Sequence, residues 1–447
     1  MKHVCLFETQ GRKIVRENDR AYLREILARA LDLKVLSLAE VSALITLRDQ
    51  DLWEDVFNAS TMVKEKVYGK RVVLFAPLYL SNECMNNCLY CGFRRGNQEA
   101  KRKTLSIEES VAEASILSSR GYKRLLLVIG ELAGAINYLE GMIDAIYKKT
   151  DIRILHVNSA PMGLNEFKRL KASGVGVYQC FQETYHIPTY RVMHPSGPKA
   201  DYYWRLNVMD RAIDAGFEDV GMGVLLGLYD WRWDVFELIA HAHRLIEKYG
   251  FGPHTISVPR LQPAQGAELK ETPYAVSDSD LKKIVAIYRL ALPYVGVVVS
   301  TREPAYLRDE LLLIGASQIS AGSRTSPAGY MEGGDTEQFE IGDWRNLEEV
   351  VGKIASLGLL PSFCTACYRE GRSGDTFRHL AEGGAIKNLC QINAILSLKE
   401  YVEDYAPEEL KLLLEGRIKE EALNLFQGNG LLGKLKQIEK GKRDMHV

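Results

Sequence analysis

From residue 71 onward, short β-rich runs alternate with amphipathic stretches, and this rhythm limits the possible folds more than any other feature. The amphipathic stretches carry apolar residues at spacings of three and four, which is the period of a helix with one buried face. Several of them begin with Asp, Ser or Asn and end on Gly, as helices do. The predicted strands are residues 72–77, 124–129, 152–158, 175–181, 219–225, 255–259, 296–300 and 318–321.

Eight β–α alternations within about 280 residues favour a parallel (β/α)8 barrel of the TIM type, with a doubly wound open sheet as the alternative. Residues 1–70 have the pattern of helices, and residues 350–447 leave the β–α rhythm for loops and further helical stretches. We therefore predict an N-terminal helical segment (1–70), a barrel (71–349) and a mostly helical C-terminal extension (350–447). A barrel of this kind places its active site at the C-terminal ends of the strands.

The charge balance and the chain's N-terminus restrict the possible partners. Lys and Arg number 57 and Asp and Glu number 58, so no overall field attracts nucleic acid or an anionic membrane. The first residues lack the apolar stretch of a signal peptide, and no run approaches the roughly 18 apolar residues that span a bilayer. We expect a cytoplasmic protein with a small-molecule partner, no nucleic acid and no membrane.

Cys84, Cys88 and Cys91 form a C-x3-C-x2-C loop directly after the first predicted strand. Three cysteinates hold three irons of a 4Fe-4S cluster and leave the fourth iron open to an exogenous ligand, which distinguishes a catalytic cluster from a closed one. A zinc knuckle is the alternative, but zinc favours four ligands and no fourth Cys or His lies nearby. The loop therefore favours an iron–sulfur cluster.

A second triplet, Cys364, Cys367 and Cys390, lies in the C-terminal extension. Its spacing fits a second open-site cluster, and it also fits a zinc site completed by His379. Spacing alone leaves both possibilities open. The two remaining cysteines stand apart, and Cys180, inside a predicted strand, is expected to pack rather than react.

The first loop, with Tyr90 as the aromatic residue of C-x3-C-x-aromatic-C, resembles the signature of the radical S-adenosylmethionine (SAM) superfamily. The resemblance implies that SAM binds the open iron and yields a 5′-deoxyadenosyl radical. It also implies positions for SAM contacts: Glu131 after the second strand for the methionyl ammonium, and Glu183 and Arg205 for the ribose hydroxyls and the carboxylate. A surface ion pair is the alternative for Arg205.

Longer segments resemble the HydG family of tyrosine lyases, which serve FeFe-hydrogenase maturation, from about residue 10 to the end. They include LFAPLYLSNECMNNCLYCGFRR, HPSGPKADYYWR, GPHTISVPRLQPA, ISAGSRTSPAGY and CTACYREGRSGD. The family implies cleavage of L-tyrosine to p-cresol and dehydroglycine, and conversion of dehydroglycine to carbon monoxide and cyanide. It implies two 4Fe-4S clusters, the second building an iron–carbonyl–cyanide unit for the hydrogenase active site. Expected partners are a donor such as ferredoxin or flavodoxin and hydrogenase maturation proteins.

Three further residues have candidate roles. His254 precedes the sixth strand, and a six-residue strand spans roughly 20 Å, so this imidazole lies too far from the SAM site to touch it. The resemblance implies that it ligates an extra iron on the second cluster; a core histidine is the alternative. Arg302 and Arg324 follow the seventh and eighth strands, and one of them, preferably Arg324, is expected to bind the tyrosine carboxylate. Either could instead pair with Glu303.

Other functions stay open at this point. A ThiH-like 2-iminoacetate synthase would share the barrel and lack the C-x2-C-x22-C extension. A radical SAM enzyme could act on another amino acid, such as tryptophan. A non-enzymatic iron–sulfur scaffold would explain the two triplets, but it would not explain Glu131 or the arginines on the active face.

Overall fold

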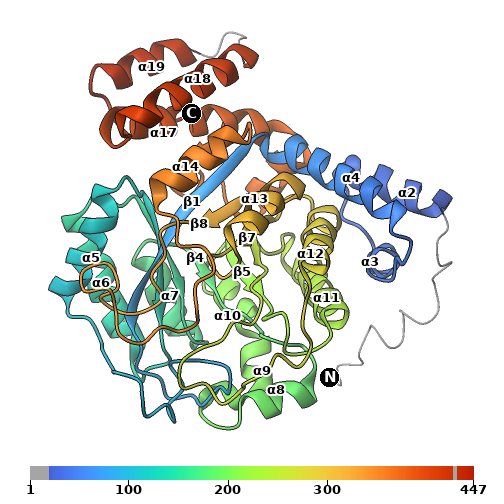
Figure 1. Cartoon of the computed structure of the whole chain (residues 1–447), viewed down its shortest axis with the longest axis vertical. Helices are drawn as coiled ribbons and strands as arrows, with labels where there is room; N and C mark the ends of the chain where they lie inside the picture. Colours follow the sequence, from blue (N-terminus) through green and yellow to red (C-terminus); the bar gives the residue numbers. More distant parts are fainter. Residues whose placement is uncertain (1–19, 426–429) are drawn as a thin grey trace.

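The structure is a computed structural model that describes residues 20–425 and 430–447. The expectations for residues 1–19, the start of the predicted N-terminal segment, lie outside the described residues. From residue 20 onward, three helices precede the first strand: α2 (Arg20–Leu31), α3 (Leu38–Ile45) and α4 (Asp51–Tyr68). They pack at one side of the barrel (Figure 1).

In the described residues the strands form one parallel sheet, and eight of them close into a barrel because β1 pairs with both β2 and β8 (Figure 1). The predicted (β/α)8 barrel is confirmed, and the open sheet is wrong. Most strands are shorter than predicted, because their ends pass into loops, and β1 is longer. The strands are β1 (Arg71–Ser81), β2 (Arg124–Ile129), β3 (Ile154–Asn158), β4 (Val175–Gln179), β5 (Val220–Gly223), β6 (Thr255–Ser257), β7 (Gly296–Val299) and β8 (Gln318–Ser320).

A further strand, β9 (Leu360–Ser362), was not predicted from the sequence. It pairs with the first three residues of β1, whereas β2 pairs with β1 only from Ala76 onward. Val73 pairs with β8 on one side and with β9 on the other, so β9 lies on the side of β1 that faces β2. The C-terminal extension therefore begins inside the sheet.

Helices surround the barrel and continue into the extension. The helical stretch after α8 is interrupted at Asn207, which ends α9 and precedes α10. The barrel helices are α5 (Ile107–Ser119), α6 (Ala135–Lys149), α7 (Leu164–Ala172), α8 (Ile187–Met193), α9 (Tyr202–Leu206), α10 (Val208–Asp214), α11 (Trp231–Tyr249), α12 (Asp278–Ala291) and α13 (Ala305–Ile314). Those after β8 are α14 (Leu347–Ser356), α15 (Ala366–Arg369), α16 (Gly374–Glu382), α17 (Ala385–Asp404), α18 (Glu408–Asn424) and α19 (Leu431–Glu439).

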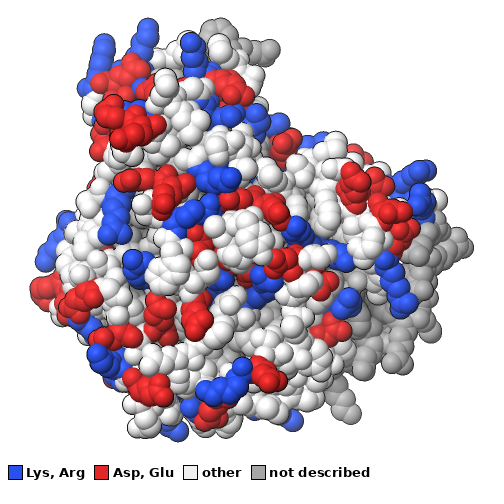
Figure 2. Space-filling model, viewed as in Figure 1, with Lys and Arg blue, Asp and Glu red and all other residues white. Residues whose placement is uncertain are grey.

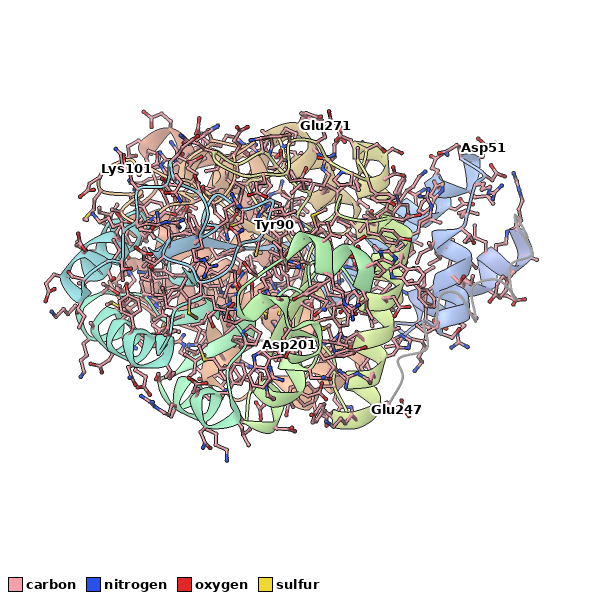
Figure 3. All side chains as sticks on the ribbon, turned by 90° about the horizontal axis from the view of Figure 1, so that it is seen from below. Asp51, Tyr90, Lys101, Asp201, Glu247 and Glu271 are labelled. Atoms are coloured by element: carbon pink, nitrogen blue, oxygen red, sulfur yellow. The ribbon has the colours of Figure 1, made fainter. Side chains whose placement is uncertain are left out.

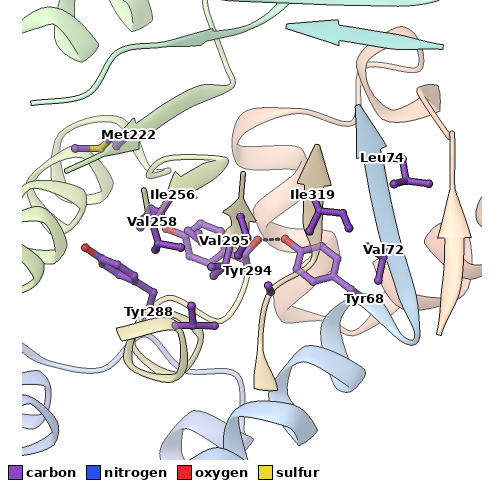
Figure 4. Packing of buried hydrophobic residues seen from close by; sticks show 14 of the residues in the cluster. Tyr68, Val72, Leu74, Met222, Ile256, Val258, Tyr288, Tyr294, Val295 and Ile319 are labelled. Atoms are coloured by element: carbon purple, nitrogen blue, oxygen red, sulfur yellow. Dashed lines mark hydrogen bonds between the residues drawn. The ribbon is translucent and has the colours of Figure 1, made fainter. Parts of the chain in front are cut away.

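The core between strands and helices is apolar, and two of the large polar side chains within it are held by hydrogen bonds to backbone carbonyls. The Tyr68 hydroxyl of α4 donates to the carbonyl of Tyr294 ahead of β7 (Figure 4). Arg289 of α12 is fully buried and donates to the carbonyls of Pro293, Val295 and Gly315. A buried guanidinium is tolerated only when its donors are satisfied in this way. These bonds fix α4 and α12 to the N-terminal end of the barrel.

The two ends of the barrel are covered differently. Helices α8 and α9, which follow β4, lie at the bottom of the view in Figure 1, and α17–α19 lie at the top. Lys and Arg side chains are interspersed with Asp and Glu over the face in Figure 2. Within the described ranges, no helix combines the length and apolar character needed to cross a membrane.

Candidate active site

A cavity of about 210 Å³ opens among the loops that follow the C-terminal ends of the strands. Tyr90, in the loop after β1, lies near the middle of the molecule when it is viewed from the side of α8 and α9 (Figure 3). Most of the predicted site residues line this cavity; Arg324 is not among the lining residues. Those that do are Cys84, Cys88, Tyr90, Cys91, Glu131, Glu183, Arg205 and Arg302.

The cysteine loop lies tightly against the end of β2. A Cβ atom on Gly130 would come within 2.1 Å of the Glu83 carbonyl oxygen, so only glycine permits this approach. The backbone N of Met85 donates to the Glu131 carbonyl at 2.9 Å and fixes the start of the loop. The resemblance implies a position for Glu131 after the second strand, and these contacts join that position to the cysteine loop.

The three thiols of the loop are free and share one pocket wall. Cys84 and Cys91 pack against an apolar cluster that contains Tyr79 and Phe93. Burial, followed by the neighbouring thiols, raises the pKa of Cys91 to about 12. Thiolates at such a site need a bound cation as partner, and three cysteine sulfurs from one loop are a donor set that fits an iron–sulfur cluster.

Asn86 joins three segments of the site and was not singled out from the sequence. Its side-chain N donates to Glu131 Oε2 at 2.5 Å, and its side-chain O accepts from the backbone N of Lys199 at 2.8 Å. The side chain is buried. Asn86 therefore holds the cysteine loop, the end of β2 and the turn before α9 in one arrangement.

Glu183 and Arg205 form a buried ion pair with a third residue, Lys199. The Lys199 Nζ lies 2.6 Å from Glu183 Oε1, and an Arg205 Nη lies 3.5 Å from the same oxygen. Burial alone would raise the pKa of the Glu183 carboxyl, but Lys199 and then Arg205 outweigh it and hold that pKa below its usual value. The surface ion pair considered for Arg205 is thus a buried one inside the cavity.

Lys199 was not predicted as a site residue, although it lies in the segment HPSGPKADYYWR, which resembles the HydG family. Burial and Arg205 disfavour the charge on Lys199, yet Glu183 outweighs them and raises the pKa of the ammonium. Its Nζ also lies 5.7 Å from the centroid of the Tyr90 ring, within reach of a cation–π interaction. The cavity therefore holds a permanent cation that the local pattern did not reveal.

Tyr90 is fixed by a buried histidine. Its hydroxyl lies 2.8 Å from His194 Nε2, and His194 Nδ1 lies 2.7 Å from the Tyr190 carbonyl. Burial, then Lys199 and Arg205, lower the pKa of His194 well below its usual value, so the imidazole is neutral. With Nδ1 donating to the carbonyl, Nε2 accepts from the Tyr90 hydroxyl.

The two candidate arginines differ in where their side chains lie. Arg302 lines the cavity and stacks on Phe339, with the guanidinium carbon 3.2 Å from the ring centroid. Arg324 lies over the exposed ring of Trp344, 5.4 Å from its centroid. Glu303 pairs with Arg260, and in the described residues no ion pair joins it to Arg302 or Arg324.

The second triplet lies at the opposite end of the barrel. Cys364 follows β9, Cys367 is on α15, and Cys390 is on α17. The carbonyl of Cys364 accepts from Arg124, the first residue of β2, at 2.7 Å. The Cys367 thiol hydrogen bonds to Cys390 and, with help from the buried cation of Arg71, holds the pKa of Cys390 below its usual value. Three free thiols beside buried arginines again fit a metal cluster.

His254 lies at this second end, as its place before β6 predicts. Its Nε2 is 3.2 Å from the hydroxyl of Tyr368, the residue after Cys367, and its Nδ1 is 3.3 Å from Asp219. His379, the alternative zinc ligand, has 68% of its side chain exposed and lies 3.2 Å from Asp375. Only His254 of these two imidazoles is turned toward the buried region of the triplet.

Comparison with known proteins identifies the family. The model of the Radical SAM superfamily matches residues 78–241, and that of the Biotin and Thiamin Synthesis associated domain matches residues 257–360. The 2-iminoacetate synthase of Escherichia coli (strain K12) is 32% identical over 337 residues, which are 74% of this chain and 88% of that protein. A crystal structure of HydG, described as a maturase of the [FeFe]-hydrogenase, is 44% identical with a TM-score of 0.94, and it covers 98% of this chain and 97% of its own.

The chain belongs to the radical SAM family of HydG and 2-iminoacetate synthase. The HydG maturase of Carboxydothermus hydrogenoformans is a second solved relative, 41% identical with a TM-score of 0.85, covering 97% of this chain and 96% of its own. Such coverage is too complete to omit the extension that carries Cys364, Cys367 and Cys390. Membership of the radical SAM family implies a 4Fe-4S cluster and SAM, which the first cysteine loop and its cavity fit.

Proposed function

We propose that this chain is a tyrosine lyase of the HydG type. It cleaves L-tyrosine to p-cresol and dehydroglycine, and dehydroglycine then yields carbon monoxide and cyanide in an iron–carbonyl–cyanide unit for the FeFe-hydrogenase active site. The observation that carries this proposal is the presence of two three-cysteine sites at opposite ends of one barrel. A 2-iminoacetate synthase needs only the first of them.

The first site holds the radical-generating groups. Cys84, Cys88 and Cys91 would hold a 4Fe-4S cluster and leave one iron open for SAM. When bound, the two supply a 5′-deoxyadenosyl radical that abstracts hydrogen from the substrate. Glu131 would accept hydrogen bonds from the methionyl ammonium of SAM. Glu183, which Lys199 keeps ionised, would accept hydrogen bonds from the ribose hydroxyls.

The charges of the cavity suit two amino-acid ligands. Arg205 is placed for the SAM carboxylate and Arg302 for the tyrosine carboxylate, since a guanidinium binds carboxylates with two parallel hydrogen bonds. We prefer Arg302 to Arg324, because Arg302 lines the cavity and no ion pair occupies its side chain in the described part of the chain. The aromatic ring of tyrosine would lie against the apolar interior of the barrel, which excludes water from the radical. Apolar side chains that line the cavity include Phe75, Leu126, Val128 and Val298.

The second site handles the fragment of the amino acid. Cys364, Cys367 and Cys390 would hold a second 4Fe-4S cluster, and His254 would offer an imidazole, a suitable ligand, to an extra iron. Tyr368 hydrogen bonds to Nε2 of His254, so it is the group that an iron at that nitrogen would displace. Arg71, buried beside the thiols, offsets their negative charge.

The charge balance of the chain bears on its partners. The near-equal numbers of acidic and basic residues, 58 and 57, give no reason to expect nucleic acid as a ligand. We infer a cytoplasmic enzyme that takes electrons from a ferredoxin or flavodoxin and hands its product to hydrogenase maturation proteins.

The test is anaerobic incubation of the reconstituted protein with SAM, tyrosine and dithionite. We expect p-cresol, 5′-deoxyadenosine, cyanide and carbon monoxide, the last trapped by deoxyhaemoglobin. p-Cresol without carbon monoxide or cyanide would show the 2-iminoacetate synthase reaction instead. Absence of both p-cresol and deoxyadenosine would overturn the proposal, and failure to bind SAM would point to a scaffold.

A further inference from the structure

Asp234, in the first turn of α11, has a buried carboxylate that is turned toward the loop after β4. Its Oδ1 accepts two hydrogen bonds, from the Thr184 hydroxyl at 3.0 Å and from the backbone N of Tyr185 at 2.7 Å. Its Oδ2 is buried without a hydrogen-bond partner in the described residues. The two donors immediately follow Glu183, which lines the cavity.

Glu183 has a backbone conformation that needs outside support. Its φ angle is +69°, in the left-handed region that side chains other than glycine rarely adopt. Such strain persists only where the surrounding structure holds it, and it is common at ligand sites. On the strand side, the carbonyl of Glu183 accepts from the backbone N of Leu225 at 2.8 Å. On the other side, Asp234 holds the next two residues.

We propose that Asp234 is a positioning residue for SAM, which fixes the strained turn so that the Glu183 carboxylate points into the cavity toward Lys199. It acts through Glu183 and touches no ligand itself. The inference rests on the proposed role of Glu183 as the acceptor for the ribose hydroxyls of SAM.

A purely structural role for Asp234 in starting α11 explains the observations less well. The helix already has an N-cap, because the exposed Asp230 accepts from the backbone N of Arg232 at 2.9 Å. A carboxylate near a helix N-terminus is favourable when it is solvated, but Asp234 is buried. Burial raises its pKa to about 7, so ionising it at this place costs free energy that a helix start does not require.

The experiment compares Asp234→Ala, Asp234→Asn and Thr184→Val in the full-length reconstituted enzyme, with Asp230→Ala as the matched control on the same helix turn. SAM affinity is measured anaerobically by calorimetry, together with the KM for tyrosine, the iron content and the melting temperature. We expect Asp234→Ala to weaken SAM binding by about tenfold with an unchanged KM for tyrosine. Asn keeps the acceptor oxygen and should restore binding to within about threefold of the native value.

Thr184→Val removes one of the two bonds and should give an intermediate loss of SAM affinity. If Asp234→Ala loses iron or fails to fold, this smaller change decides the matter. Native SAM affinity in the folded Asp234→Ala and Thr184→Val enzymes, or an equal loss in Asp230→Ala, would overturn the inference.

Glu183→Gln separates this inference from the function on which it rests. If Glu183→Gln binds SAM like the native enzyme, the role proposed for Glu183 is wrong. If it binds SAM weakly while Asp234→Ala binds normally, only the positioning role of Asp234 is wrong.

Discussion

The ammonium of Lys199 lies 2.6 Å from the carboxylate of Glu183, and both side chains are buried beside the cysteine loop. Removing one partner of a buried pair leaves the other charge poorly compensated. We expect Lys199→Met to lower the free energy of unfolding by about 3 kcal/mol, since Arg205 compensates Glu183 only in part. Urea unfolding checks this.

The control for that prediction is Lys148→Met, which removes an exposed lysine paired with Asp144 one helical turn away. It should change the free energy of unfolding by less than about 0.5 kcal/mol, as exposed pairs usually do. Equal losses in the free energy of unfolding would mean that the pair of Lys199 and Glu183 stabilises the fold no more than an exposed pair does.

Arg302 and Arg324 form a matched pair for testing recognition of the substrate carboxylate. Because Arg302 lines the cavity and Arg324 packs on Trp344, Arg302→Met should raise the KM for tyrosine about a hundredfold, at the scale of a lost charge-assisted contact. Arg324→Met should leave the KM within about threefold of the native value. Initial rates of p-cresol formation measure both, and the reverse order would assign the carboxylate to Arg324.

The separation of the two cysteine sites predicts separable activities. Changing both Cys364 and Cys367 to Ala should remove roughly half of the bound iron, keep p-cresol formation and abolish carbon monoxide. Cys84→Ala should abolish both products together with 5′-deoxyadenosine. Iron analysis, chromatography and haemoglobin trapping distinguish the two variants. Loss of p-cresol in the C-terminal variant would contradict independent roles.

Asp234 predicts a pH-dependent stability. Burial raises its pKa from 3.8 to about 7, so the folded state holds this proton more tightly than the unfolded state. The stability that the protonated Asp234 side chain contributes is therefore fully present below the unfolded pKa. It is lost as the pH rises through about 7. Relative to the native protein, Asp234→Asn should gain stability between about pH 4 and pH 7, the interval between the two pKa values.

Urea unfolding at several pH values follows this difference. A constant difference between Asp234→Asn and the native protein across this range would show that Asp234 does not titrate there.

The barrel and the place of each cysteine triplet could be predicted because they depend on local patterns: strand and helix periods, and short spacings. The role of Lys199 could not be predicted, because it depends on contacts with Glu183 and with Asn86, which is 113 residues away in the chain. The choice between Arg302 and Arg324 depends on how the loops turn each side chain, which their similar distances from a strand do not reveal. The strand β9 has three residues, one of them Pro361, and is too short for a period.

β9 pairs with Arg71–Val73, the first three residues of β1. β2 leaves this part of β1 free, so β9 covers what would otherwise be an open strand edge, with unpaired N–H and C=O groups able to recruit another chain. The extension that carries the second cysteine site thus also supplies the strand that pairs with the free edge of β1. Trimming this chain ahead of β9 would therefore remove the second cysteine site and leave the edge of β1 unpaired in a single cut.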